Sequence, residues 1–404
     1  MSEGQIKKNI AIFYIAEFAK ATLLFQTVVW FSYESKFLTG EQIAFFGAMI
    51  VIVEVLSQIP TGAFADIFGK KSAIIIGNLF SLIGFSLFAL FPSVSIMIIF
   101  TICYGISNAF TSGTYSAMLY EVLQNAGKGD LYPRIKANGS LMFQFSGAVF
   151  LMLGGYLYVI ASFLPYLCVM FGFLVGAINA FYLHEVHLDK SKFNYKAFIK
   201  QNVDGFREIF KSSYVSRLTI AYVLIGGIAF GSQRFLVVPY MSELGLGEVE
   251  KGWTAMIVKL SVSLFGFWLI RNKKFFMNKY FILIIPLVMV IVLMPIKYFT
   301  LPISMVFLLG IGFASANADL FMSPLINSNL ESRVRTTALS AQYMLIAIVY
   351  AILQICSASF IANNRVGDFY QLLGIFTVVI IIPLVISLIH KGKPVEPDIS
   401  LVGE

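Results

Sequence analysis

Long apolar runs separated by short polar stretches make up most of the chain. Ser72–Phe91, which reads SAIIIGNLFSLIGFSLFALF, carries no charge in twenty positions, and similar runs begin at Ile282 and Leu372. About 20 such residues form a helix long enough to cross the hydrocarbon core of a bilayer. The pattern therefore predicts an all-α polytopic membrane protein.

Twelve spans fit this pattern. They cover approximately residues 9–33, 42–65, 70–91, 94–122, 134–159, 161–184, 216–241, 250–271, 278–296, 300–328, 335–361 and 367–390.

One connection between these spans is long. Residues 185–215 are polar and basic, and Phe198, Phe206, Ile209 and Phe210 fall roughly on one side of a helix. This spacing fits an amphipathic helix lying on the membrane surface. A partly disordered linker is the alternative.

The chain also repeats short sequences in the same order about 200 residues apart. The pairs are AMIV at Ala48 and Ala255, GISNAF at Gly105 with GIGFAS at Gly310, and RIK at Arg134 with RVR at Arg333. Two parallel repeats of this kind are a transporter architecture. We expect a six-helix half over 1–184, a cytoplasmic central loop over 185–215 and a second six-helix half over 216–404.

Composition and charge support the membrane interpretation. The chain is 58% hydrophobic and only 12% charged, with a net charge of +8. With a cytoplasmic amino terminus, 22 of the 29 Lys and Arg residues fall on the inner side, as the positive-inside rule requires. We expect a multi-pass protein of the cell membrane, with both termini cytoplasmic, that contacts the lipid bilayer and no nucleic acid.

No pattern in the chain indicates catalysis, a metal or a cofactor. Cys103, Cys168 and Cys356 stand alone in apolar segments, and HEVH at His184 lacks the H-E-x-x-H spacing. We expect no cofactor and no enzymatic activity.

The stretch PTGAFADIFGKKS, Pro60–Ser72, invites comparison with a phosphate-binding loop. Six residues separate Gly62 from Gly69, whereas the phosphate loop requires four, and Asp66 would direct negative charge at a phosphate. The flanking segments are membrane spans rather than a strand and a soluble helix. A nucleotide site is therefore excluded on spacing, charge and context.

Gly62, Asp66, Gly69, Lys70 and Lys71 instead match the pattern G-x-x-x-D-x-x-G-[RK]-[RK] between the second and third spans. This resembles the signature of the major facilitator superfamily, and with the preceding IPTG it resembles the drug:proton antiporter branch. The resemblance implies twelve helices in two halves, alternating access, and a cytoplasmic gate formed by this motif.

The motif also has a direct physical interpretation. Gly62 is expected to permit close helix approach and Gly69 a tight turn, while Asp66 is placed to meet a helix amino terminus. Lys70 and Lys71 would anchor the turn in the cytosol. Four features depart from the antiporter pattern. Gln58 replaces a frequent Glu, Thr101 stands where an Arg is common, RNKKFFMNK lacks a second copy of the motif, and the span-5 signature keeps Gly147, Gly154 and Gly155 without its Gly-Pro pair.

Six charged residues stand out within the predicted spans, away from the span ends, where a charge is costly and is by default a functional candidate. They are Glu17, Lys20, Glu54, Arg234, Lys259 and Asp319. Carboxylates here could load protons or attract cations, and Arg234 with Lys259 could hold an anion. Structural ion pairs are the alternative, above all for Glu17 with Lys20, which lie one turn apart. Glu34 and Glu121, near span ends, are expected to be solvated.

The sequence thus predicts a monomeric, proton-coupled secondary transporter. Its substrates would be small amphipathic or cationic compounds, and export is the favoured direction. Import, or export of a specific metabolite, lipid or siderophore, is the first alternative. A non-transporting receptor or regulator with the same fold is the second.

Overall fold

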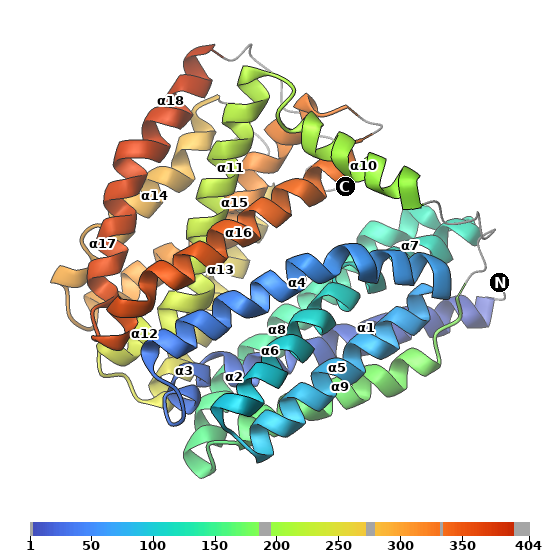
Figure 1. Cartoon of the computed structure of the whole chain (residues 1–404), viewed down its shortest axis with the longest axis horizontal. Helices are drawn as coiled ribbons and strands as arrows, with labels where there is room; N and C mark the ends of the chain where they lie inside the picture. Colours follow the sequence, from blue (N-terminus) through green and yellow to red (C-terminus); the bar gives the residue numbers. More distant parts are fainter. Residues whose placement is uncertain (1–2, 186–194, 272–278, 332–333, 392–404) are drawn as a thin grey trace. The chain divides into compact units, whose positions relative to one another are not determined.

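The chain forms two compact units of helices (Figure 1). The computed structural model describes residues 3–185, 195–271, 279–331 and 334–391, and no β-strand occurs in those ranges. Unit 1 comprises Met1–Phe193 and Leu246–Leu260, and unit 2 comprises Asn194–Gly245 and Ser261–Glu404. The all-α fold class is confirmed.

Unit 1 contains the helices of the amino-terminal half. They are α1 (Glu3–Ala21), α2 (Leu24–Thr27), α3 (Trp30–Glu34), α4 (Gly40–Phe68), α5 (Lys70–Leu90), α6 (Val94–Thr111), α7 (Thr114–Asn125), η1 (Gly129–Leu131), α8 (Tyr132–Ile160), α9 (Leu164–Phe181) and the first part of α13 (Glu248–Arg271).

The first predicted span, 9–33, is broken into the three helices α1, α2 and α3. The Thr22 hydroxyl donates to the Ala19 carbonyl oxygen at 2.6 Å and the Thr27 hydroxyl to the Leu23 carbonyl oxygen at 3.0 Å. Such bonds from side chain to backbone compete with regular helix bonds and bend helices. Leu23, Val28 and Val29 keep right-handed helical dihedrals, so the span continues through both interruptions.

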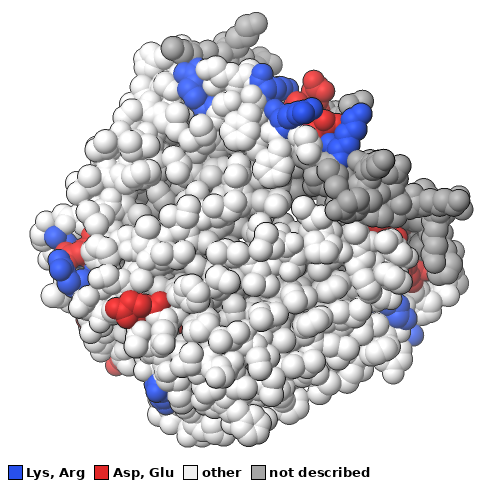
Figure 2. All heavy atoms as spheres, viewed as in Figure 1, with Lys and Arg blue, Asp and Glu red and all other residues white. Residues whose placement is uncertain are grey.

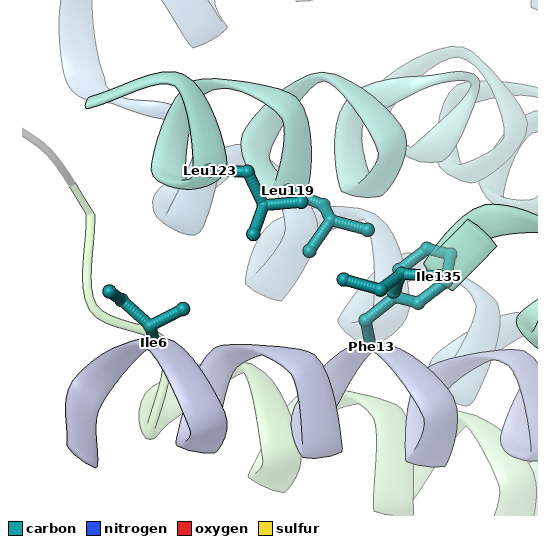
Figure 3. Close-up of a cluster of buried hydrophobic side chains, with 5 residues drawn as sticks. All are labelled: Ile6, Phe13, Leu119, Leu123 and Ile135. Carbon is teal, nitrogen blue, oxygen red and sulfur yellow. The ribbon is translucent and has the colours of Figure 1, made fainter. Parts of the chain in front are cut away.

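A buried apolar cluster joins α1, α7 and α8 in unit 1. Ile6 and Phe13 come from α1, Leu119 and Leu123 from α7, and Ile135 from α8 (Figure 3). All five side chains are at most 8% exposed. Burial of this kind stabilises each contact by the removal of apolar surface from water.

Unit 1 also includes the first part of α13, which the division of the sequence into halves placed in the second half. A Cβ on Gly252 would lie 2.9 Å from the carbonyl oxygens of Leu151 and Met152, and a Cβ on Gly155 would collide with the Glu248 carbonyl oxygen. Two glycines therefore let the backbones of α13 and α8 touch. Close backbone contact explains why Leu246–Leu260 packs with unit 1.

Unit 2 contains the remaining helices. They are α10 (Tyr195–Glu208), α11 (Ser213–Gly231), the π-helical segment η2 (Ser232–Leu236), α12 (Val237–Glu243), the rest of α13, η4 (Lys279–Leu283), α14 (Ile284–Leu293), η5 (Ile296–Tyr298), α15 (Ile303–Asn329), α16 (Arg335–Ala362), α17 (Val366–Phe376), the π-helical segment η6 (Thr377–Ile381) and α18 (Ile382–Lys391).

The long central connection is helical over Tyr195–Glu208, as the amphipathic spacing indicated. This helix, α10, packs on α16, and Ile209 immediately after it is fully buried. The first part of the connection, 186–194, lies outside the described residues. A location on the bilayer surface remains a prediction.

Within the described residues, eleven helices are long and apolar enough to cross a membrane. The eighth predicted span corresponds to α13, whose 24 residues extend about 36 Å and so exceed the hydrocarbon thickness. In the space-filling view, Lys, Arg, Asp and Glu side chains make up only small parts of the visible surface (Figure 2). A broad uncharged surface suits contact with lipid.

Candidate functional site

The motif between α4 and α5 forms the tight turn expected from its glycine. Gly69 has φ 94° and ψ 150°, a conformation essentially restricted to glycine. The close helix approach expected at Gly62 is wrong for this structure, because a Cβ there would meet no atom within 4 Å among the described residues.

The motif lysines are held by other helices of unit 1. The Lys70 ammonium lies 2.6 Å from Oε1 of Glu121 on α7, and the Lys71 ammonium donates to the Phe181 carbonyl oxygen at 2.6 Å. Glu121, expected to be solvated, is therefore an ion-pair partner, and its side chain is 26% exposed. The lysines fix the turn to α7 and α9 as well as adding positive charge.

A carboxylate absent from the motif completes this turn. Oε1 of Glu185 accepts a hydrogen bond of 2.5 Å from the backbone N–H of Lys70, at the amino terminus of α5. The helix dipole favours an anion at that position. Asp66, expected near a helix amino terminus, is exposed and forms no hydrogen bond or ion pair with the described part of the chain. Glu185 therefore occupies the place that we expected for Asp66.

Glu54 lies where α4 and α6 approach closely. A Cβ on Gly105 would lie 2.7 Å from Cγ1 of Val53, and one turn further along α6 the Asn108 amide donates to Oε2 of Glu54 at 3.2 Å. Glu54 is neither fully buried nor fully exposed. The sequence signal was present in GISNAF, whose glycine permits the approach and whose asparagine supplies the donor.

Glu17 and Lys20 form no ion pair with each other in the structure. Cγ of Glu17 lies 3.3 Å from the position of a Cβ on Gly139, so this side chain extends toward α8 at that level. The Lys20 ammonium lies 5.7 Å from the centre of the Phe143 ring, and the Lys259 ammonium lies 5.0 Å from the same ring. The structure therefore brings the two lysines to one aromatic side chain.

In unit 2, Asp319 is bonded by two tyrosines. Oδ1 of Asp319 accepts hydrogen bonds from the Tyr222 hydroxyl at 2.6 Å and from the Tyr343 hydroxyl at 3.2 Å. These groups come from α15, α11 and α16. Arg234 lies in the π-helical segment η2, with its guanidinium carbon 5.1 Å from the centre of the Phe230 ring.

Sequence reasoning missed a buried ion pair in unit 1. Lys251, at the start of the predicted span 250–271, is only 2% exposed, and its ammonium lies 2.7 Å from Oε1 of Glu248 and 3.0 Å from the Ser32 hydroxyl. The spacing i, i+3 between Glu248 and Lys251 is the signal that could have revealed the pair.

Glu34, expected to be solvated, is also buried. Its residue is 7% exposed and follows the second break in the first span, outside the membrane-spanning segments. Burial raises the pKa of this carboxyl from 4.5 to about 8. Next to it in sequence, Tyr33 packs against Phe88 and Tyr166, so the end of α3 is part of the unit 1 core.

Comparison with known proteins identifies the family. Residues 10–355 match the family model of the Major Facilitator Superfamily. An uncharacterized MFS-type transporter of Bacillus subtilis (strain 168), YxaM, is 26% identical over 223 residues, which are 52% of this chain and 53% of that protein. The chain thus spans about half the length of this curated relative in the alignment.

Solved structures share the fold at low sequence identity. A mutant of the nucleoside transporter NupG superposes with a TM-score of 0.73 at 16% identity, covering 95% of this chain and all of that one. A bacterial homologue of the human lysosomal transporter Spinster, in an inward-facing and unoccupied conformation, gives 0.69 at 13% identity, covering 96% of this chain and 97% of that one. Together with the motif and the spans, the family match shows that this multi-pass membrane protein belongs to the major facilitator superfamily of transporters.

Proposed function

We propose that the chain is a proton-coupled secondary transporter that moves small amphipathic compounds across the cell membrane by alternating access. It would act as a monomer with cytoplasmic termini and export its substrate. Family membership supports transport itself, and the charged residues within the spans support coupling to protons.

One observation carries the proton coupling: Asp319 is hydrogen-bonded by the neutral hydroxyl groups of Tyr222 and Tyr343. A hydroxyl group both donates and accepts hydrogen bonds, so it can serve a carboxylate and, after reorientation, a protonated carboxyl. The site therefore offers a hydrogen-bond partner to Asp319 in both protonation states. A buried cationic partner would instead favour the ionised state alone.

Glu54 has a bond of the same reversible type. The Asn108 amide donates to the Glu54 carboxylate, and its carbonyl oxygen can accept from the protonated acid. We therefore assign proton loading to Asp319 and Glu54, with Glu17 as the third candidate. Loss of the proton would accompany hydration of the site as the transporter changes state.

Transport in proteoliposomes with an imposed pH gradient of either sign tests this function. The probes are ethidium, uridine and phenylacetate, which are a cation, a neutral nucleoside and an organic anion. Asp319→Asn and Glu54→Gln should each reduce gradient-driven accumulation at least tenfold while leaving gradient-free exchange measurable. Glu41→Gln, at an exposed position in the first turn of α4, is the matched control. Full proton-driven transport in variants at Asp319, Glu54 and Glu17 would contradict the assignment.

A further inference from the structure

Asp319 is an exposed carboxylate deep within the long apolar helix α15. It is the seventeenth of the 27 residues of Ile303–Asn329, so about 15 Å of helix separates it from the carboxyl-terminal end. The residue is exposed and forms no ion pair with the described residues of the chain. A charge at membrane depth is costly against lipid and faces water or a partner. Asp319 is therefore open to a ligand from a hydrated part of the transporter.

The two tyrosine hydroxyl groups that bind this carboxylate share one of its oxygens. Tyr222 donates to Oδ1 at 2.6 Å and Tyr343 donates to the same atom at 3.2 Å. Within the described residues, no group donates to Oδ2. An ionised carboxylate accepts hydrogen bonds through both oxygens. Oδ2 is thus the atom left for a donor on a ligand.

Contacts between α11 and α16 hold the tyrosines in place. The Gln342 amide donates to the Thr219 hydroxyl at 2.9 Å, and a Cβ on Gly226 would lie 3.1 Å from Cδ1 of Ile346. These two contacts lie about one turn before and one turn after Tyr222 on α11. A site supported in this way has its geometry fixed before the ligand arrives.

An exposed aromatic ring lies beside the carboxylate. Tyr343 is 51% exposed, whereas Tyr222 is 2% exposed, and the centres of the two rings are 6.4 Å apart. The face of a tyrosine ring attracts a cation, and the same ring offers apolar surface for packing. A negative charge, an acceptor atom and an apolar surface therefore occur together at this position.

These features favour one class of ligand. Because both hydroxyl protons are directed to Oδ1, the three side chains present acceptors and no remaining donor. An organic anion would meet a like charge, and a neutral hydroxyl group would donate without charge attraction. A protonated amine supplies both an N–H donor and a positive charge, and such charge-assisted bonds are roughly twice as strong as neutral ones.

We propose that Asp319 and Tyr343 form the binding site for a protonated organic amine with an aromatic or flat apolar group, and that Tyr222 positions Asp319. The amine donates to Oδ2 of Asp319, and its apolar body lies on the ring of Tyr343. Tyr222 is buried and acts only through the carboxylate. This inference rests on the proposed transport function and names the class of its substrate.

Ligand-dependent thermal stabilisation of the purified full-length protein at neutral pH tests the proposal. The probes share a phenyl group and differ in charge: 2-phenylethylamine, 2-phenylethanol and phenylacetate. The amine should raise Tm in a saturable manner, and the alcohol and the anion should not. Asp319→Asn should raise the Kd for the amine at least tenfold, and Tyr343→Ala should raise it several-fold.

Glu331→Gln is the matched control, because it removes an exposed carboxylate of the same unit just after the end of α15. It should bind the amine as the unmodified protein does. Equal stabilisation by 2-phenylethanol, unchanged amine binding in Asp319→Asn, or no stabilisation by the amine would overturn the proposal.

A double-mutant cycle separates the positioning role of Tyr222 from a general structural role. Tyr222→Phe should raise the Kd for the amine about fivefold in the unmodified protein. It should have no further effect in the Asp319→Asn background, because Tyr222 acts through that carboxylate. An equal loss in both backgrounds would contradict the positioning role.

A second measurement leaves Asp319 unchanged, so it applies even if Asp319→Asn fails to fold. Ala316 is exposed and lies one turn before Asp319 on α15. In a background without Cys103, Cys168 and Cys356, Ala316→Cys is labelled with a methanethiosulfonate. Saturating 2-phenylethylamine should slow this labelling several-fold, and 2-phenylethanol should not. Labelling at the same rate with and without the amine would contradict the site.

The binding tests use no gradient, so they are separable from proton coupling. Amine binding that depends on Asp319, together with full proton-driven transport in the variants at Asp319, Glu54 and Glu17, would keep the site and reject the proposed function. Loss of proton-driven transport in Asp319→Asn with unchanged amine binding would reject the site and keep the function.

Discussion

Single carboxylates in this protein hold the starts of helices through backbone bonds. Glu185 accepts from the N–H of Lys70 at the start of α5, and Glu243 accepts from that of Val366 at the start of α17. Glu208 accepts from the N–H of Glu331 at 2.7 Å. Burial opposes ionisation of Glu208, but bonds from Lys211 and Glu331 outweigh it and lower its pKa. The Glu185 and Glu243 carboxylates thus bond N–H groups at helix starts, whereas Glu208 bonds an N–H just after the end of α15.

Glu34 should make the folded protein less stable as the pH rises. Because its pKa in the folded state is about 8, the folded protein keeps this proton while the unfolded chain loses it above about pH 4.5. Stability should fall by up to about 1.4 kcal/mol per pH unit between these values. Glu34→Gln removes this dependence, so the Tm of the variant minus that of the unmodified protein should grow from pH 5 to pH 8 and then level off. Glu41→Gln should show a flat difference; a flat difference for Glu34→Gln as well would place its pKa near 4.5.

The two motif glycines should respond oppositely to alanine. Gly69→Ala forces a conformation at φ 94° that costs about 1–3 kcal/mol, and its Cβ would lie 2.5 Å from the Glu185 carboxylate. Gly62→Ala adds a methyl group in open space inside α4 and should stabilise it by about 0.5–1 kcal/mol. Thermal unfolding of both variants in detergent checks this. Similar Tm changes for the two would show that the turn does not need glycine.

At the scale of helices, the sequence predicted the membrane segments well and their interruptions poorly. Apolar length decides whether a segment crosses a bilayer, and that is visible in a single chain. The breaks at Thr22 and Thr27 arise from hydroxyl groups that also occur in unbroken helices, so they carry no unique signal. Gly113, with φ 72° between α6 and α7, is the break that its residue type could have suggested.

The candidate sites could also be predicted only in part, because the sequence shows single residues but not the partners that packing gives them. The sequence found Asp319 because a carboxylate in an apolar run is unusual, but its partners Tyr222 and Tyr343 lie 97 and 24 residues away. Tyrosine is common in this chain, so only the packing of α11, α15 and α16 selects these two. In the same way, Lys20 and Lys259 were each visible, and their common contact with Phe143 was not.

The buried pair Glu248–Lys251 should fix the start of α13 to α3. Lys251→Met leaves the Glu248 carboxylate without its cation and should destabilise the protein by about 3–5 kcal/mol. Lys251→Met combined with Glu248→Gln should recover part of this loss. Lys297→Met, which breaks the more exposed pair with Asp368, should cost under about 1 kcal/mol. Equal losses in Tm for the two single variants would mean that burial of Lys251 does not matter.

For the whole molecule, the division of α13 between units links the two halves of the chain. Residues 191–404 contain Leu246–Leu260, which packs within unit 1. When residues 1–190 and 191–404 are expressed as separate chains, they should therefore co-purify through a tag on either one. Gly252→Val adds atoms where the Cβ alone would lie 2.9 Å from the Leu151 carbonyl oxygen, so it should reduce co-purification. Gly62→Val is the matched control, and equal recovery with both variants would argue against this contact.

Asp66 should affect the transport cycle more than substrate affinity. It lies near the end of α4 beside the Gly69 turn, and its carboxylate has no partner within the described residues. Such a group is available to a partner in another state of the transporter. Asp66→Asn should slow turnover about tenfold while equilibrium binding of a transported probe changes less than about threefold. A loss of affinity with normal turnover would assign Asp66 to the substrate site.

In the π-helical segment Ser232–Leu236, the helix can lose a residue without a change in the orientation of the residues that follow. Its bonds run from i to i+5, so it accommodates one residue more than an α-helical turn does. Deleting one residue inside this segment would convert it to regular helix and leave Glu243, beyond it, in position to hold the start of α17. Deleting one residue from α11 instead would rotate Glu243 by about 100° around the helix axis and release Val366 and Gly367. The helix thus contains a surplus residue at the segment that carries Arg234, where a deletion can be absorbed without turning the rest of the helix.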